Sequence, residues 1–526
     1  VPAGPPGTLR LIAVNTTAEP VSGVVQAYVD VPYESDEPRR VVDPGALDAP
    51  VRFWPKDAHI AGIATHDGQP APFQVLSVEE SRPVVMSRYE TPWILRGRRH
   101  HVVWQGQVPA CGYATFDAVF ATTSVSPGAG ATATDVRVDG RTAENEHVRI
   151  AINDDGTVDV EDKRSDVRYQ RCGTLEDVGD VGDEYNYSPP ATDRRITSAD
   201  LTDVRITAGD AGPLRASFRI DGNLALPAAI TPDRSRRSDE VVINAVSIIV
   251  TLDAGSPRVG WRIAIDNRSA DHRLRLLFPT GVDEITEVRA ETAFGVARRP
   301  ARRERPEHVR MEVPVSYGPT ASFTEAGSDC AGAILFGEGL SEYEAVPGDD
   351  GRVSTLALTL LRCVGYLSRE DLVLRPSGHA GPGLATPGAQ CPGRHEFHLA
   401  FEPRGDAPSN GTLFRRAASF ATPPLVVPAV GAGGQQPATS TFLQIEAGPG
   451  DVVLSACHRA EEHDGIIVRM FNADETPAMV YVTSKTPVNA GAAVDFLERD
   501  RHSLPVQNGG VDAQVPPYGI VTMRMT

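Results

Sequence analysis

Lysine is scarce in this sequence, since only Lys56, Lys163 and Lys485 stand among the 51 basic residues. No stretch of about eighteen consecutive apolar residues occurs, so the sequence offers no candidate for a membrane-spanning helix. The six cysteines form no C-x-x-C pair, which removes the spacing typical of the common zinc sites. The formal net charge of −18 disfavours nucleic acids and anionic membranes as partners, because proteins bind both largely by neutralising phosphates.

The composition that remains is typical of a folded protein with many turns. Hydrophobic residues make up 41% of the 526 positions, well above the range of disordered chains. The 48 glycines and 43 prolines exceed the usual share and suit an all-β chain. This length predicts about three or four domains. The use of arginine in place of lysine, with much Ala, Gly and Pro, indicates a bacterial source, and we expect a cytoplasmic location.

The chain reads as three β-rich blocks separated by low-complexity segments. We predict domains at residues 1–121, 135–421 and 438–526. The linkers at 122–134 and 422–437 are rich in Gly, Ala, Ser, Thr and Pro, which is typical of flexible connections.

Alternating hydrophobicity within the blocks predicts β-strands. Trp261, Ile263 and Ile265 alternate with polar or small residues, as in a strand with one buried face. The segment Val241–Leu252 is more continuously apolar and predicts a strand covered on both faces. No segment offers four clean turns of helical periodicity with caps, so we predict less than about a tenth of the residues in helix.

A short pattern recurs near the ends of the first and last blocks. The segment Val108–Thr115 reads V-P-x-x-G-x-x-T, and Val515–Thr522 repeats it. Proline suits the start of a strand, and glycine permits a bulge or a positive φ. We predict that both segments lead into the closing strands of separate small sandwiches.

The segment Leu175–Pro190 is the most informative part of the sequence. It contains five carboxylates and two tyrosines, and glycines and Pro189-Pro190 interrupt it, which predicts a shaped loop. Carboxylates accept hydrogen bonds from sugar hydroxyls, and tyrosine rings stack on the apolar faces of pyranoses. The alternative interpretation is a solvated acidic surface loop ended by the prolines.

A predicted hairpin precedes this loop, with alternating residues at 148–152 and 158–160 around a turn at Asn153–Gly156. The hairpin followed by G-D-V-G-D-E-Y-N-Y-S-P-P resembles the start of the large β-domain of glycoside hydrolase family 38, which contains α-mannosidases and mannosylglycerate hydrolases. Further segments resemble this family in the same order, namely Gly339–Glu344, Leu358–Arg369, Ala380–Pro382, Thr386–Gly393 and Val468–Asn472.

The resemblance implies a fold and a division of labour. The fold would be all-β, a large supersandwich of the galactose-mutarotase type flanked by two smaller β-sandwich domains. Family members carry an aspartate nucleophile and a zinc bound by His and Asp in an N-terminal α/β barrel. No His-x-Asp spacing occurs in this sequence. We therefore expect the half of the enzyme without the barrel, with no cofactor in this chain, zinc in the barrel, and no activity of this chain alone.

The resemblance also suggests residues that contact substrate. The loop supplies Asp183, Glu184, Tyr185 and Tyr187 as candidates for hydroxyl recognition and stacking, and Arg362 falls at the family's arginine position. Arg362 would hold a hydroxyl or order an acidic neighbour such as Asp183. The alternatives are an ordinary strand arginine and tyrosines that serve interdomain packing. We expect no catalytic residue and no metal ligand in this chain.

Two functions from different classes follow. The first is the non-catalytic C-terminal half of a retaining α-mannosidase-type glycoside hydrolase, which packs on the barrel and lines its cleft. The alternative is a stand-alone carbohydrate-binding or scaffolding protein. The expected partners are an α-mannoside or related carbohydrate, the catalytic barrel and possible further copies of the chain, with neither nucleic acid nor membrane.

Overall fold

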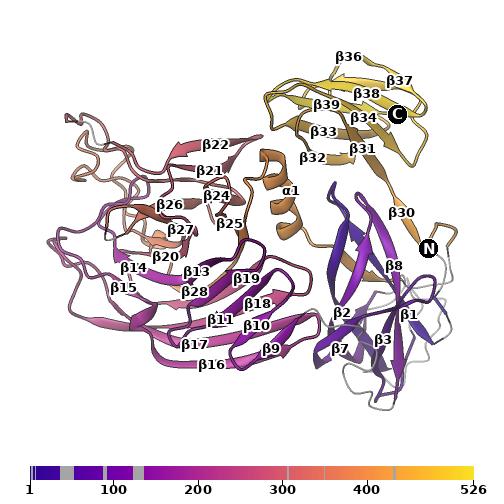
Figure 1. Ribbon diagram of the computed structural model, residues 1–526, viewed down its shortest axis with the longest axis horizontal. Coiled ribbons are helices and arrows are strands. Elements are labelled where there is room, and N and C mark those ends of the chain that lie inside the picture. Colours follow the sequence, from indigo (N-terminus) through magenta and orange to yellow (C-terminus); the bar gives the residue numbers. More distant parts are fainter. Residues whose placement is uncertain are drawn as a thin grey trace. The chain divides into compact units, whose positions relative to one another are not determined.

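The computed structural model describes residues 1, 4–5, 7–35, 52–86, 92–122, 136–304, 307–348, 350–429 and 434–526. Strands account for 56% of the residues and helices for 4%, which confirms the all-β prediction (Figure 1). Within the described ranges the helices are α1 (Asn410–Ala421) and the 3₁₀ turns η2 (Ser198–Asp200) and η3 (Pro387–Gln390). None of these described helices has the length and apolarity needed to cross a membrane.

The chain divides into two compact units. The first unit contains residues 1–136, 212–215 and 409–526, and the second contains 137–211 and 216–408. The predicted linker 122–134 lies almost entirely outside the described residues. Part of the predicted linker 422–437 forms a strand, β29, which pairs with β1. The three predicted blocks themselves stay a prediction.

The N-terminal part of the first unit is a sandwich of two antiparallel sheets with a core that includes Leu11, Val25, Trp104 and Phe116. One sheet contains β29 (Leu425–Pro428), β1 (Thr8–Asn15), β8 (Gly112–Ala121), β3 (His59–Thr65), β4 (Pro70–Ala71) and β30 (Thr439–Thr441). The other contains β2 (Val21–Ser35), β7 (Trp93–Val108), β5 (Phe73–Ser81) and β6 (Val84–Val85).

The C-terminal part of the first unit is a second sandwich, whose core includes Val468, Met470, Val482 and Met523. One sheet contains β31 (Leu443–Ala447), β34 (Ala478–Ser484), β38 (Gly510–Val515) and β37 (Val506–Gln507). The other contains β32 (Val452–Arg459), β33 (Ile466–Asn472), β39 (Ile520–Met525), β35 (Gly491–Val494) and β36 (Asp500–Leu504).

The repeated V-P-x-x-G pattern leads into β8 and β39, one in each sandwich, which confirms that prediction. The glycines do not supply a positive φ, one of the two reasons predicted for them, because the positive φ angles belong to the preceding residues, Cys111 (41°) and Tyr518 (50°). The glycines are needed for close approach instead. A Cβ on Gly112 would lie 2.3 Å from the carbonyl oxygen of Ser440.

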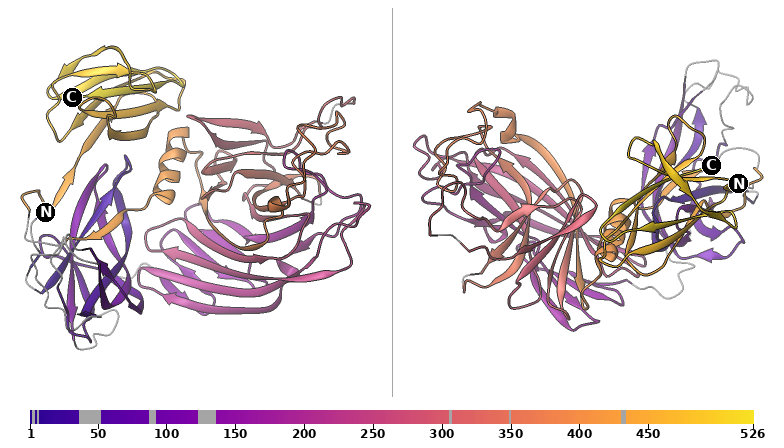
Figure 2. Two further views of the ribbon diagram at one scale, coloured as in Figure 1. Left: turned by 180° about the vertical axis from the view of Figure 1, so that it is seen from behind. Right: turned by 90° about the horizontal axis from the view of Figure 1, so that it is seen from above.

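The second unit contains three antiparallel sheets. The nine-stranded sheet is curved (Figure 2) and runs through β16 (Thr202–Ala211), β17 (Arg215–Pro227), β18 (Val241–Asp253), β19 (Val259–Asn267), β28 (Gly393–Arg404), β25 (Gly332–Gly337), β24 (Phe323–Gly327), β21 (Glu287–Thr292) and β22 (Gly295–Pro300). The six-stranded sheet runs through β15 (Ile196–Thr197), β14 (Thr174–Gly179), β20 (His272–Pro279), β27 (Val353–Cys363), β26 (Glu342–Pro347) and β23 (Tyr317–Pro319). The five-stranded sheet runs through β13 (Val167–Cys172), β12 (Val158–Asp162), β11 (Val148–Ile152), β10 (Thr142–Glu144) and β9 (Arg137–Asp139).

An aromatic cluster joins these sheets in the core of the second unit. The ring of Trp261 on β19 meets Phe278 on β20 edge-on, with 5.2 Å between centroids. Phe278 stacks on Phe401 at 5.6 Å, and Tyr169 meets Phe401 at 5.1 Å. Because edge-to-face and stacked aromatic pairs add to area burial, this cluster fixes how the sheets face each other.

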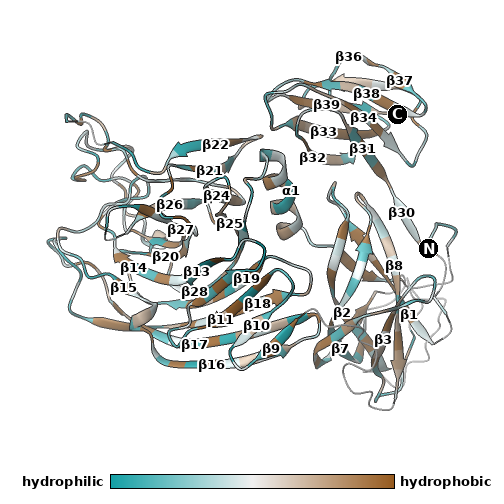
Figure 3. Cartoon of the chain, viewed as in Figure 1, coloured by the Kyte–Doolittle hydropathy of each residue, from teal (hydrophilic) through white to brown (hydrophobic). Residues whose placement is uncertain are grey.

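The predicted hairpin is confirmed by the pairing of β11 with β12, and Gly156 adopts a φ of 79° in its turn. The prediction that the Val241–Leu252 segment is covered on both faces was wrong. Val241 is 53% exposed and Ile243 is 49% exposed, while alternate residues of β18 are buried. Apolar and polar residues alternate along β16, β17 and β19 (Figure 3), as expected when only one face of a sheet is covered.

Candidate functional site

The outer face of the six-stranded sheet carries a buried network of charged side chains. Residues of β20 alternate, so Leu274 and Leu276 face the core and Arg273 and Arg275 face outward. Arg273 is 1% exposed and donates hydrogen bonds to Glu344 (2.8 Å) and Glu342 (2.7 Å) on β26. Arg275 bridges Glu344 and Glu176 of β14.

The carboxylates determine the charge state of this network. Burial alone would lower the pKa of the Arg273 guanidinium, but Glu344 and Glu342 raise it above its ordinary value. Burial likewise acts to raise the pKa of Glu344, and the neighbouring Arg273 and Arg275 hold it below its ordinary value. Each group therefore stays ionised because its opposite charge lies within contact distance.

The loop of residues 180–190 follows β14 and begins with a buried aspartate. Asp180 is 1% exposed, and its Oδ1 accepts hydrogen bonds from the backbone amides of Gly182 (2.8 Å) and Ser188 (3.2 Å). A Cβ on Gly182 would lie 2.1 Å from the Asn186 carbonyl oxygen, so no larger residue fits there. Burial raises the pKa of Asp180, and the charge of Arg362 offsets part of this effect.

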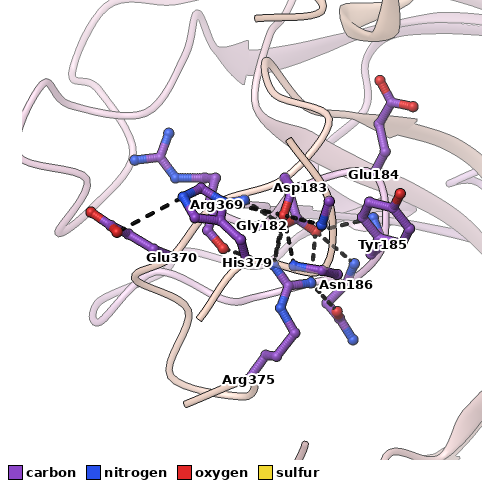
Figure 4. Close-up of polar contacts among 12 residues, drawn as sticks. Gly182, Asp183, Glu184, Tyr185, Asn186, Arg369, Glu370, Arg375 and His379 are labelled. Atoms are coloured by element: carbon purple, nitrogen blue, oxygen red, sulfur yellow. Dashed lines mark hydrogen bonds and ion pairs between the residues drawn. The ribbon is translucent and has the colours of Figure 1, made fainter. Parts of the chain in front are cut away.

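Asp183 is the hub of a second buried cluster, shown in Figure 4. It is fully buried, and its Oδ1 accepts hydrogen bonds from the amides of Tyr185 (3.0 Å) and Asn186 (2.9 Å). Its Oδ2 accepts the amide of Arg369 (2.8 Å) and pairs with the guanidinium of Arg375. Burial would raise the pKa of Asp183, but Arg375 and the amides hold it below its ordinary value.

Arg375 connects the 180–190 loop to a segment almost two hundred residues later in the chain. Its side chain is 1% exposed and also donates a hydrogen bond to Asn186. Its Nε donates to the carbonyl oxygen of Gly378 (2.8 Å), and its Nη2 donates to that of Arg369 (2.8 Å). One guanidinium therefore holds residues 183–186 against residues 369–378. A carboxylate that accepts this many internal donors has little capacity left for a ligand.

Arg362 lies at the end of β27 and braces the same loop. Its Nε donates to Asp180 Oδ2 at 2.9 Å, and its two Nη groups donate to the backbone carbonyl oxygens of Asp183 and Glu184. The expectation that Arg362 orders an acidic neighbour is met by Asp180, whereas Asp183 contributes its backbone. The Arg362 side chain is 16% exposed.

The two predicted tyrosines differ in environment. Tyr187 is half-buried and lies under Arg273, whose guanidinium carbon is 4.8 Å from the ring centroid. Burial and the charge of Asp180 raise the pKa of the Tyr187 hydroxyl. Tyr185 is 52% exposed and its ring lies against Gly381, where a Cβ would be 2.8 Å from the hydroxyl oxygen. Glu184 is also exposed and points away from the Asp183 hub in Figure 4.

The structure brings the predicted site residues into one region but gives them unequal roles. Asp183, Tyr187 and Arg362 hold the loop, while Glu184 and Tyr185 present their side chains to solvent. The motif segments of the sequence converge here, since the Gly365 carbonyl oxygen accepts the Thr386 amide and the Leu384 carbonyl oxygen accepts the Leu367 amide, both at 2.9 Å.

Sequence reasoning missed Arg375 and Arg273 as organisers of this region. Arg375 stands in an irregular segment with no motif around it, so no local signal marks it. Arg273 alternates with leucines on β20, a pattern that is typical of a solvent-facing arginine. Only the burial of its side chain reveals the difference.

Within the described part of the chain, no cluster of three or more His, Cys, Asp or Glu side chains could hold a metal ion. The residues described therefore do not fit the zinc that the resemblance places in a barrel.

Two family models match the chain. Residues 143–365 match the model described as the glycosyl hydrolases family 38 C-terminal domain. Residues 451–523 match the model described as the family 38 C-terminal beta sandwich domain. The two matched regions keep the order of the family and lie in the second unit and in the C-terminal sandwich of the first.

A curated relative and two solved structures are also similar. A protein of Halalkalibacterium halodurans named "Putative mannosylglycerate hydrolase" is 27% identical over 397 residues, which are 73% of this chain and 41% of that protein. An alpha-mannosidase from Enterococcus faecalis shares the fold with a TM-score of 0.78 at 22% identity, over 99% of this chain and 56% of the other. A family 38 protein from the same organism gives a TM-score of 0.78 at 22% identity, over 99% of this chain and 58% of the other.

The supersandwich with its braced acidic loop thus places this chain in the class of glycosidase β-domains. More narrowly, the chain belongs to glycosyl hydrolase family 38 and corresponds to the C-terminal β-domains of that family. It spans about half the length of the solved structures it matches, and the curated relative is matched over 41% of its length.

Proposed function

We propose that this chain is the non-catalytic C-terminal half of a retaining α-mannosidase-type glycoside hydrolase and lines the substrate cleft beside a zinc-dependent barrel. Membership of family 38 and the names of the relatives support the reaction class. The observation that carries the cleft-lining role is a loop held rigidly by buried ion pairs with Glu184 and Tyr185 left exposed at its tip.

The state of the loop carboxylates supports a non-catalytic role. A retaining glycosidase needs two carboxylates about 5 to 5.5 Å apart, one as nucleophile and one as acid and base. Asp180 and Asp183 are buried and bound to Arg362 and Arg375. Glu184 is then the exposed carboxylate of the 180–190 loop, and it has no second exposed carboxylate beside it in that loop.

The exposed pair is suited to sugar binding rather than bond cleavage. The Glu184 carboxylate would accept hydrogen bonds from sugar hydroxyls, and the Tyr185 ring would stack on an apolar sugar face. Arg362 acts as a positioning residue, because it holds the backbone carbonyl oxygens of Asp183 and Glu184. The bracing lowers the entropy that the loop would lose on binding.

Enzyme kinetics on the protein that combines the barrel with this chain test the proposal. Glu184→Gln and Tyr185→Ala should each lower kcat/KM for an aryl α-mannoside by roughly threefold to a hundredfold, the equivalent of one lost hydrogen bond or stacking contact. Tyr28→Ala is the matched control, since Tyr28 is 57% exposed on β2 in the other unit. Full activity in both loop variants would contradict the cleft-lining role.

The same proposal predicts that this chain alone does not hydrolyse aryl α-mannosides. An assay of the purified chain with an aryl α-mannoside measures this directly. Turnover that disappears in Glu184→Gln would show that the chemistry resides in this chain.

A further inference from the structure

The outer face of the nine-stranded sheet in the second unit contains a polar groove. Its cavity measures about 460 Å³ and is lined by side chains of β16, β17, β18, β19 and β28. This volume falls within the range of roughly 300–1,000 Å³ that is common for small-molecule sites. The lining strands belong to the nine-stranded sheet, whereas the 180–190 loop follows β14 of the six-stranded sheet.

Small residues on adjacent strands form the floor of this groove. Ala245 and Ser247 lie at outward positions of β18, and Ala264 lies at an outward position of β19. Ser247 and Ala264 are directly paired across the two strands. Outward positions of an exposed sheet usually carry long polar side chains, so this run of short ones leaves a hollow between longer neighbours.

Charged side chains form the walls. Arg205 on β16 is paired in register with Asp221 on β17, and Arg219 donates to Asp221 at 2.8 Å. Asp266 on β19 stands opposite Arg394 on β28. The Arg219 and Asp221 side chains are 55% and 39% exposed, and exposed ion pairs contribute little, so their groups remain available to a ligand.

The Arg205 guanidinium acts on Asp221 through its charge, but it donates no side-chain hydrogen bond to any residue that the structure describes, so its N–H groups are available to a ligand. Asp221 accepts from Ser247 and Arg219, and its pKa lies below the ordinary value chiefly because of Arg219. The groove therefore holds guanidinium donors beside ionised acceptors. Three arginines and three aspartates line it, so their formal charges cancel.

We propose that this groove binds a short neutral oligosaccharide, as a second carbohydrate site apart from the 180–190 loop. Alternating donors and acceptors match hydroxyl groups, which donate and accept at the same atom, and the balanced charge favours an uncharged ligand. The exposed Val241 and Ile243 continue the outward row of β18 beyond Ala245 and provide an apolar surface for sugar C–H groups. The choice of a mannose-based ligand rests on the proposed function.

Calorimetric titration of the full chain with α-linked mannotriose, and in parallel with cellotriose, tests the groove. An open site of this kind should bind mannotriose with a dissociation constant on the order of 1 mM. Arg205→Ala and Asp221→Asn should each weaken binding roughly tenfold, because each removes a charged hydrogen-bonding partner. Arg298→Ala is the matched control, since Arg298 is 55% exposed on β22 at the opposite edge of the same sheet.

The outcomes separate this site from the loop. Glu184→Gln and Tyr185→Ala should leave mannotriose binding to the groove unchanged while they lower turnover in the barrel-containing enzyme. Unchanged affinity in both Arg205→Ala and Asp221→Asn, or no binding of either trisaccharide, would overturn the proposal. Binding of cellotriose alone, lost in Arg205→Ala, would keep the groove as a carbohydrate site and contradict its assignment to a mannose-based ligand. The proposed function would be tested separately by the turnover of the barrel-containing enzyme.

Discussion

The two outer faces of the second unit use charged residues in opposite ways. On the six-stranded sheet Arg273 is 1% exposed, and in the adjoining loops Asp183 and Arg375 are buried to the same degree. On the nine-stranded sheet, Arg219 and Asp221 form a pair of similar distance with both side chains in contact with solvent. The burial of the charged side chains, and not the presence of an ion pair, determines which face stabilises the fold and which face remains accessible to a ligand.

The largest expected effect comes from breaking the buried pair. Arg375→Ala leaves the Asp183 carboxylate buried without its cation, which typically costs about 3–5 kcal/mol of stability. Arg205→Ala, on the open face, should change the free energy of unfolding by less than about 0.5 kcal/mol. Urea denaturation of both variants measures the difference in the free energy of unfolding. Equal losses of stability would contradict the difference between the two faces.

A smaller loss is expected at the contact between Tyr187 and Arg273. Tyr187→Leu removes a cation–π contact over a buried guanidinium and should cost about 0.5–2 kcal/mol. Tyr185→Leu provides the matched control in the same loop, because that side chain is 52% exposed. In thermal or urea unfolding, Tyr187→Leu should be less stable than Tyr185→Leu. The reverse order would contradict the packing role of Tyr187.

The buried face should also dominate acid sensitivity. Burial tends to raise the pKa of Asp183, but Arg375 and the backbone amides hold it below its ordinary value. Its contribution to stability is therefore complete above the unfolded pKa of about 3.9 and is lost as pH falls through the lower folded pKa. Asp183→Asn should flatten the acid limb of the unfolding free energy measured across a pH series. An acid limb as steep as that of the unchanged chain would contradict this assignment.

The smallest effect is expected on the open face. Asp221→Asn removes one partner of an exposed pair and should change the free energy of unfolding by less than about 0.5 kcal/mol. Its unfolding curve should therefore overlay that of the unchanged chain, while its carbohydrate affinity falls. A loss of more than about 1 kcal/mol of unfolding free energy would show that the exposed pair also stabilises the fold.

Much of the local structure could be predicted from the sequence. Alternation predicted the strand that became β19, the turn residues Asn153–Gly156 predicted the hairpin, and glycines with Pro189-Pro190 predicted the irregular loop. Each signal lies within a few residues of the structure it specifies. The candidate site residues could be named as a group for the same reason, since four of the five stand together at 183–187. The contacts of Glu184 and Tyr185 with a substrate stay a prediction.

Long-range burial could not be predicted. The continuous apolar run in β18 suggested two covered faces, yet Val241 and Ile243 are exposed, because hydrophobicity alone does not specify what packs against a strand. Strand β29 lies in a predicted linker and exists through its pairing with β1, more than 400 residues earlier. The pairing of Asp183 with Arg375 spans 192 residues, and no periodic pattern in the sequence indicates it.

The sequence by itself determined the all-β class, the low helix content, the order of the family segments and the residues of the acidic loop. These properties depend on side-chain alternation, turn chemistry and local composition, which act between near neighbours. Only the tertiary structure decided which acids became buried anchors, as Asp183 did, and which stayed exposed, as Glu184 did. The two residues are adjacent in the chain, and the difference arises because the environment of a charge is set by residues that only folding brings together.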